Sequence, residues 1–249
     1  MISIHNLSKI YNEGRPNEIN ALRHITITIN KGEYVVIVGA NGSGKSTLLN
    51  TIGGSVLPTS GKISIDNNNV SKLPEHSRSK WIAKVFQNPT QSTASELTIL
   101  ENFRLAAIRT TNKTLKIGIQ PNFELLVKDK ISSLKMGLEN KIHMPMGALS
   151  GGQRQALTIL MSVMDDLKIL LLDEPTAALD PRSAEMVMKI THELISENQL
   201  TAILVTHNIK DAGLYGNRII QMNEGEIVKD IGQAEKQNLA SADIFNWFL

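Results

Sequence analysis

The first part of the chain alternates between hydrophobic and polar residues with the period of a β-strand. Ile25, Ile27 and Ile29 are separated by single threonines, so a strand would place all three isoleucines on one face. Residues 34–38 form instead an unbroken apolar run, which is typical of a central strand buried on both faces. Glycines interrupt the pattern at residues 39–44, and residues 45–52 are predicted to form the helix that follows.

The rest of the chain divides into a helical middle and a second alternating part. Short strands are predicted at residues 63–65 and 83–86. Between residues 97 and 164 the apolar spacing becomes helical, and Gly118, Pro121 and Pro145 divide this stretch into short helices. Beyond it the pattern predicts strands at 169–172 and 201–206, helices at 181–196 and 208–215, and a hairpin of 218–222 with 226–228. Strands on both sides of a helical insertion indicate an α/β core with a mostly parallel sheet.

Composition narrows the possible partners. The 249 residues carry a formal net charge of +2 without any basic block, which argues against nucleic acid. No cysteine is present, so neither a disulfide nor a thiolate metal site can form. We expect no signal peptide and no membrane-spanning helix, because no apolar run approaches about 18 residues. A membrane process would therefore need its channel from other chains.

A phosphate-binding loop is the strongest chemical signal. The pattern G-x-x-x-x-G-K-[ST] is matched by Gly39, Ala40, Asn41, Gly42, Ser43, Gly44, Lys45, Ser46 and Thr47. Glycines let successive N–H groups approach phosphate oxygens, and the helix N-terminus adds its dipole. Lys45 is predicted to reach the β and γ phosphates and Ser46 to ligate Mg²⁺. A plain glycine-rich turn is the alternative, but the strand–loop–helix context favours binding of ATP or GTP.

Two carboxylates follow the apolar strand at residues 169–172. Asp173 is expected at the carboxyl edge of the sheet beside the phosphate loop, where it would hold Mg²⁺. Glu174 can polarise the water that attacks the γ-phosphate. Acidic turn residues after a strand are common, so this pair has weight only together with the phosphate loop.

A second glycine turn precedes a helix predicted from about residue 154. It consists of Leu149, Ser150, Gly151, Gly152 and Gln153. Ser150 is suited to cap the helix, and the N–H groups beside the two glycines form a second anion site. Since one nucleotide needs only one such turn, we infer that this turn serves a nucleotide held by another copy. The alternative is an ordinary helix start.

These three motifs, in this order, resemble those of the ATP-binding subunits of ABC transporters. The resemblance covers about residues 2–232. It implies an α/β fold: a P-loop NTPase core with a mostly parallel sheet, an antiparallel β subdomain and an inserted helical subdomain. Within one domain of residues 1–249, we expect the core and β subdomain at 1–96 and 165–232. The helical subdomain is expected at 97–164 and a C-terminal helical tail at 233–249.

The resemblance implies further site residues. Tyr11 matches the aromatic residue that stacks on adenine, although residues 12–20 form a longer excursion than many members have. Gln87 matches the glutamine that senses Mg²⁺ and the γ-phosphate, and residues 90–102 resemble the region that docks a membrane subunit. Asp180 matches the loop that crosses the dimer interface, but it could also be only a helix cap. His207 matches the switch histidine that contacts the γ-phosphate and Glu174.

The family mechanism implied here is an ATPase that works as a head-to-tail homodimer. ATP and Mg²⁺ would lie on the phosphate loop of one copy under the Ser150 turn, Gln153 included, of the other. Lys45, Glu174 and His207 are the predicted catalytic residues. Ser46, Asp173 and Gln87 are the predicted Mg²⁺ ligands.

A closer resemblance concerns the transport system. Residues 73–76, 149–157 and 215–218 look like a bacterial subfamily that accompanies predicted tryptophan or tyrosine uptake systems. This implies membrane permease subunits, an extracytoplasmic solute-binding protein and a cytoplasmic location on the inner face of the membrane. Nothing in the chain is expected to touch the solute.

Other functions remain to be weighed. An exporter or lipoprotein-extraction ATPase has a similar subunit, and gene neighbours would separate these systems from an importer. Non-transport ABC ATPases usually carry coiled coils, zinc cysteines or paired ATPase domains, which this sequence lacks. A P-loop kinase would leave residues 149–153 unexplained. The tail at residues 242–249 is interpreted as a helix packed on the core, with a partner surface as the alternative.

Overall fold

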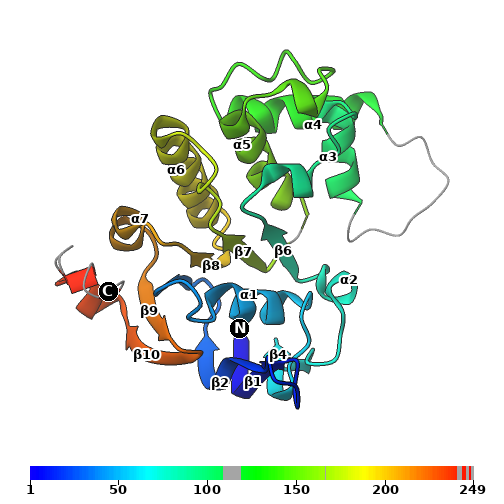
Figure 1. Ribbon diagram of the computed structural model, residues 1–249. Helices are drawn as coiled ribbons and strands as arrows, with labels where there is room; N and C mark the ends of the chain where they lie inside the picture. Colours follow the sequence, from blue (N-terminus) through cyan, green and yellow to red (C-terminus); the bar gives the residue numbers. More distant parts are fainter. Residues whose placement is uncertain (109–118, 166, 240–242, 245–246, 248–249) are drawn as a thin grey trace. The chain divides into compact units, whose positions relative to one another are not determined.

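The computed structural model describes residues 1–108, 119–165, 167–239, 243–244 and 247. The chain forms two compact units (Figure 1). The first comprises Met1–Ile82, Lys168–Glu174 and Gln199–Leu249, and the second Ala83–Leu167 and Pro175–Asn198.

One sheet of the first unit is antiparallel throughout, in the order β2-β1-β4-β5. Its strands are β1 (Ile2–Tyr11), β2 (Ile19–Ile29), β4 (Ser60–Ile65) and β5 (Asn68–Asn69). The predicted alternation is confirmed in β2, where Ile25, Ile27 and Ile29 are buried and the threonines between them are exposed. In β1 the alternation is interrupted, because Asn6 has a φ of 48° and the register shifts between Ile4 and Leu7.

The second sheet carries the predicted phosphate loop. Its order within the first unit is β10-β9-β3-β8-β7, parallel except for β10. The strands are β3 (Tyr34–Val38), β7 (Ile169–Asp173), β8 (Thr201–Val205), β9 (Arg218–Asn223) and β10 (Glu226–Ile231). Every residue of β3 is buried, as the unbroken apolar run predicted. The carboxyl ends of β3, β7 and β8 therefore meet along one edge of this sheet.

The helix after the phosphate loop joins the two sheets. α1 (Lys45–Gly53) contacts β2 of the antiparallel sheet and β7 and β8 of the parallel sheet. Its Leu48, Leu49 and Ile52 belong to a buried hydrophobic cluster that contains residues of both sheets. The other described helices of this unit are α2 (Glu75–Arg78), α7 (Ile209–Leu214) and α8 (Gln233–Lys236). Burial of α1 on both sides fixes the start of the helix, where phosphate would bind.

The second unit is mostly helical after the end of β6 (Ile82–Val85). Its described helices are α3 (Ile99–Ala107), α4 (Pro121–Ser132), α5 (Gly151–Ser162) and α6 (Pro181–Glu197), with 3-10 turns η1 (Pro89–Ser92) and η2 (Met146–Ala148). α5 contacts α3, α4 and α6 and is buried from Arg154 to Ser162. It begins at Gly151, not near residue 154 as expected, because the Ser150 cap starts the helix directly. The predicted helical subdomain, residues 97–164, falls within this unit.

The predicted C-terminal helix lies mostly outside the described residues. Within residues 242–249, Ile244 and Trp247 are buried. The Trp247 carbonyl oxygen accepts a hydrogen bond from Gln221 Nε2 at 3.1 Å. These contacts favour a packed tail over an exposed one. In the described part of the chain, no helix is both long and apolar enough to cross a bilayer.

Candidate active site

The phosphate loop connects β3 to α1, as predicted, and the backbone around it requires its glycines. Gly44 has a φ of 97°, and a methyl group on it would lie 2.5 Å from the Ala21 carbonyl oxygen. Gly39 has a φ of 146°, and a methyl group on it would overlap the Met222 carbonyl oxygen. Only glycine can adopt these positive φ values and also allow such close contacts with the neighbouring backbone. The loop is thereby wound closely enough for its N–H groups to surround an anion.

Lys45 lies against the loop that precedes it. Its side chain is buried, and Nζ donates hydrogen bonds to the carbonyl oxygens of Gly39 at 2.8 Å and Ala40 at 2.9 Å. Burial lowers the pKa of the Lys45 ammonium, while the nearby Glu174 and Asp173 carboxylates act in the opposite direction. The positive charge is thus held over the loop, where phosphate oxygens would bind.

Ser43 shows that the loop fits a phosphate. Its Oγ is buried and has no hydrogen-bond partner among the described residues. Buried hydroxyls are normally paired, so an unpaired one within a loop of N–H groups indicates a place for a ligand oxygen.

Ser46 and Asp173, two of the three predicted Mg²⁺ ligands, lie next to each other. Ser46 is the second residue of α1 and Asp173 ends β7, and Ser46 Oγ donates a hydrogen bond to Asp173 Oδ1 at 3.0 Å. A hydroxyl and a carboxylate are both oxygen ligands of the kind that Mg²⁺ prefers. The two residues therefore fit a metal ion that also binds phosphate.

Glu174 and His207 lie together at the carboxyl ends of β7 and β8. His207 Nδ1 is 3.1 Å from Glu174 Oε2, as the predicted switch arrangement requires. Glu174 has a φ of 46°, and its N–H donates to the Val205 carbonyl oxygen at 3.0 Å. The turn after β7 therefore holds the carboxylate toward the histidine.

A cavity of about 560 Å³ is lined by several of these groups. Its lining includes Tyr11, the loop from Asn41 to Thr47 except Ser43, and Glu174. The excursion after Tyr11 is ordered by its own hydrogen bonds, among them Gly14 N–H to Glu18 Oε2 at 2.8 Å. Glu18 and Arg23 also line the cavity, and no local motif indicated them. The cavity has the size and polarity of a nucleotide site.

The second unit brings the Ser150 turn next to the start of α6. Ser150 Oγ accepts from Gln153 N–H at 3.3 Å, and Gln153 Oε1 accepts from Ser150 N–H at 3.2 Å, which forms a capping box. A methyl group on Gly152 would lie 2.8 Å from the Ser183 side chain of α6. Asp180 caps α6 through a hydrogen bond from Ser183 N–H to Oδ1 at 3.1 Å. Ser150 and Asp180 thus both act as helix caps, which is compatible with the roles predicted for them in a dimer.

Gln87 follows β6 in the second unit and is exposed. Phe86, the residue before Gln87, is held by Gln155, a residue whose role the sequence did not reveal. Gln155 is fully buried, and its Nε2 donates to the carbonyl oxygens of Pro175 at 2.7 Å and Phe86 at 3.3 Å. Gln155 thus links α5 to the segments that follow β6 and Glu174, and no local pattern distinguishes it from any other helical glutamine.

Comparison with known proteins decides the family. Residues 22–177 match the family model described as ABC transporter. The chain belongs to the ABC transporter family. It is 40% identical, over its whole length, to the tyrosine transport ATP-binding protein of Clostridioides difficile (strain R20291), of which it covers 98%. It is 36% identical to the macrolide export ATP-binding/permease protein MacB of Mannheimia succiniciproducens, over 96% of this chain but 36% of that protein.

A solved structure of this family has the same fold. It is the dimeric structure of a post-hydrolysis state of the ATP-binding cassette MJ0796 bound to ADP and Pi, with a TM-score of 0.79 and 32% identity. The match covers 94% of this chain and 99% of that chain. The predicted fold class and ATPase activity are confirmed: this is an ATP-hydrolysing ABC transporter subunit, of a family whose ATPase domains dimerise and work with membrane permeases. The roles of the individual site residues stay predictions.

Proposed function

We propose that the chain drives the import of an amino acid such as tyrosine, as a homodimer bound to a separate permease on the inner face of the membrane. The relative named for tyrosine transport supports this proposal, because it matches the chain in length as well as in sequence. An extracytoplasmic solute-binding protein would complete the system. The transported solute would be recognised by those other chains.

In this proposal the residues of the first unit bind and hydrolyse ATP. The phosphate loop and Lys45 bind the phosphates, and Ser46 and Asp173 would hold Mg²⁺, which would neutralise charge on the phosphate oxygens. Glu174 accepts a proton from the attacking water, and His207 orients Glu174. The observation that carries this assignment of the ATP site is the closeness of Ser46 Oγ and Asp173 Oδ1, since a motif from α1 and a motif from β7 meet there at 3.0 Å.

In the second unit, the Ser150 turn would bind the nucleotide of the other copy. Gly151 is exposed, and the first turn of α5 offers unpaired N–H groups and a positive dipole end. Asp180, Gln153 and Gln87 would complete the composite site. Hydrolysis removes the γ-phosphate that both copies bind, and the dimer then opens.

The permease would dock on the segment after Gln87. A cavity of about 450 Å³ in the second unit is lined by Ser92, Thr93, Ala94 and Leu105, and the Leu105 side chain is 51% exposed. The buried Arg154 of α5 holds this segment, donating to Thr93 Oγ1 and Ser95 Oγ at 2.6 Å each. An apolar contact on a firmly held segment suits transmission of motion to a partner.

ATP binding by the purified chain tests the proposal. Lys45→Ala removes the buried ammonium and should weaken ATP binding in isothermal titration by about tenfold or more, since hydrogen bonds between charged groups contribute strongly. Lys62→Ala on β4 is the control, because this exposed residue lies outside the cavity. Equal ATP affinity of Lys45→Ala and the unchanged chain would remove the phosphate-loop assignment.

Export is the second candidate, because MacB is 36% identical over nearly the whole of this chain. Purification of the chain from membranes with its bound partners, identified by mass spectrometry, separates the two functions. Import predicts a separate permease and loss of tyrosine uptake when the chain is absent. Export predicts that tyrosine uptake is unchanged and that efflux of the exported compound is lost when the chain is absent.

A further inference from the structure

The turn of the β9–β10 hairpin contacts the phosphate loop. Gly225, in this turn, donates its N–H to the Ser43 carbonyl oxygen at 3.1 Å. Met222 is the second-last residue of β9. Its carbonyl oxygen approaches Gly39 so closely that no methyl group would fit between them. We propose that this turn positions the phosphate loop for ATP, with Gly225 as the positioning residue. The inference rests on the proposed function of the loop.

The phosphate loop needs such support because of its own conformation. When successive N–H groups face a phosphate, the carbonyl groups face the other way and must find donors elsewhere. The carbonyl oxygens of Gly39 and Ala40 accept from Lys45 Nζ, and that of Ala40 also accepts from Ser43 N–H at 3.2 Å. The Ser43 carbonyl oxygen accepts instead from Gly225, a residue far along the chain. Position 225 therefore takes part in setting the course of the loop just before Gly44 and Lys45.

Gly225 also joins the loop to β2. Its carbonyl oxygen accepts from Arg23 N–H at 2.8 Å. A methyl group on Gly225 would lie 2.9 Å from the Ala21 carbonyl oxygen, and one on Gly44 would lie 2.5 Å from that same oxygen. Three backbone segments thus meet without side chains between them. Because the atoms in contact are backbone atoms, a methyl group at 225 must move the turn or β2.

The conformation of Gly225 makes the position specific for glycine. Its φ is 82°, in the left-handed region that other residues rarely adopt. Glu224 before it also has a positive φ, of 46°, so the chain passes through a tight turn here. Only glycine combines this φ with the close approach to Ala21.

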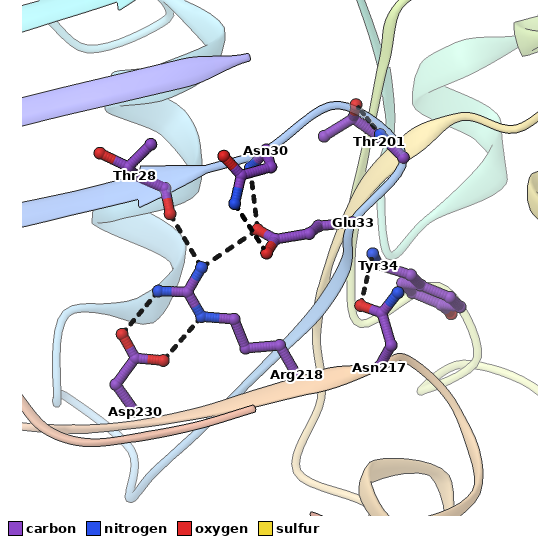
Figure 2. A network of polar contacts seen from close by, with 9 residues as sticks. Thr28, Asn30, Glu33, Tyr34, Thr201, Asn217, Arg218 and Asp230 are labelled. Carbon is purple, nitrogen blue, oxygen red and sulfur yellow. Dashed lines mark hydrogen bonds and ion pairs between the residues drawn. The ribbon is translucent and has the colours of Figure 1, made fainter. Parts of the chain in front are cut away.

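The other end of the hairpin is anchored, which fixes the place of the turn. Figure 2 shows Arg218 at the start of β9 in a network with β10 and the β2–β3 connection. Arg218 donates from Nε and Nη2 to the two carboxylate oxygens of Asp230, at 2.7 and 2.6 Å. Its Nη1 donates to the Thr28 carbonyl oxygen at 2.8 Å and to Glu33 Oε2 at 3.1 Å. The hairpin is therefore held at its open end and contacts the phosphate loop at its closed end.

Gly225→Ala tests the inference, with Gly32→Ala as the matched control. Gly32 has a φ of 79°, but a methyl group on it would have no atom within 4 Å. Both variants add backbone strain of the same kind and should lower the melting temperature, Gly225→Ala by more because its methyl group also displaces the Ala21 backbone. Gly225→Ala alone should weaken ATP binding, by about tenfold in isothermal titration, because it alone displaces the loop. Equal ATP dissociation constants for the two variants would overturn the inference.

A measurement on the unchanged chain keeps the test independent of folding. ATP should slow hydrogen exchange at the Gly225 amide together with the amides of the phosphate loop, because the Ser43–Gly225 hydrogen bond joins them. Protection of the loop by ATP without any change at Gly225 would overturn the inference. If the unchanged chain bound no ATP, the proposed function would fail. If it bound ATP and Lys45→Ala did not, an unaffected Gly225→Ala would overturn the positioning role alone.

Discussion

A single strained residue places the predicted base of the reaction. Glu174 is held at a φ of 46°, which costs a residue with a side chain about 1 kcal/mol. The Val205 carbonyl oxygen accepts its N–H at 3.0 Å, and His207 Nδ1 lies 3.1 Å from its carboxylate. Strain of this kind persists only where the surroundings impose it, so these contacts hold the Glu174 carboxylate in place beside His207.

Glu174→Gln is expected to abolish hydrolysis while leaving ATP bound. The amide keeps the shape of the side chain but cannot accept a proton from water, so the rate should fall by at least about 10²-fold. Because the γ-phosphate persists, the variant should remain a dimer in the presence of ATP. Single-turnover hydrolysis and size-exclusion chromatography with ATP measure the two effects.

Glu226→Gln is the control for Glu174→Gln. Glu226 is an exposed carboxylate on β10 and does not line the cavity of about 560 Å³. Its replacement should leave both the hydrolysis rate and the oligomeric state unchanged. Hydrolysis by Glu174→Gln at the rate of the unchanged chain would discredit its role as the base.

At this scale the sequence predicted the residues that belong to local motifs, but not those that support them. Lys45, Ser46 and Asp173 were identified because each has a fixed place within a short pattern. Gln155 was missed, since what distinguishes it is its contact with two carbonyl groups far away in the chain. Gly225 was seen only as part of a hairpin turn, because the Ser43 carbonyl that it binds is remote in sequence.

Among the elements, α1 is held at both ends. Its N-terminus follows the phosphate loop, and the carbonyl groups near its C-terminus are bound by a buried arginine, Arg78. Arg78 Nη1 donates to the carbonyl oxygens of Thr51 and Ile52 at 2.7 Å each, and Nε donates to that of Leu73 at 2.9 Å. Burial lowers the pKa of Arg78 to about 10, so the guanidinium group is still charged at pH 7. A positive charge at the C-terminus of a helix is favourable, because the dipole is negative there.

Arg78→Met should therefore lower the free energy of unfolding, by about 3 kcal/mol, since several buried carbonyl oxygens lose their donor. Chemical denaturation measures this loss. Arg15→Met is the control: Arg15 is exposed, and its replacement should change stability by less than about 0.5 kcal/mol. A stability of Arg78→Met equal to that of the control would mean that water satisfies the carbonyl groups instead.

The elements themselves were largely predictable, and the exceptions have a local cause. β3 was predicted with its observed bounds because a strand buried on both faces is a continuous apolar run. β1 gave no such signal, since the bulge at Asn6 puts the buried residues out of alternation. The start of α5 was expected too late, because glycines at 151 and 152 look like loop residues although Ser150 caps the helix before them.

At the scale of the whole molecule, the predicted site residues are distributed over both units. The first unit carries the phosphate loop, Asp173, Glu174 and His207, and the second carries the Ser150 turn. If the chain works as a head-to-tail dimer, each ATP needs the first unit of one copy and the second unit of the other. Two copies with different defects could then form one intact site between them.

Lys45→Ala and Gly151→Asp should therefore each be inactive alone but recover activity when mixed. Aspartate at position 151 would repel the triphosphate held by the other copy. It should not unfold α5, since an acidic residue suits the first turn of a helix and a methyl group there meets only the flexible Leu179 side chain at 3.2 Å.

In mixed dimers, one site combines the intact loop of the Gly151→Asp copy with the intact turn of the Lys45→Ala copy. Random pairing would give about a quarter of the normal number of sites, which ATP hydrolysis at equal total concentration measures. Gly151→Asn, of nearly the same size but uncharged, should keep most of its activity alone. A mixture as inactive as its two components would show that the Ser150 turn does not act on the nucleotide of the other copy.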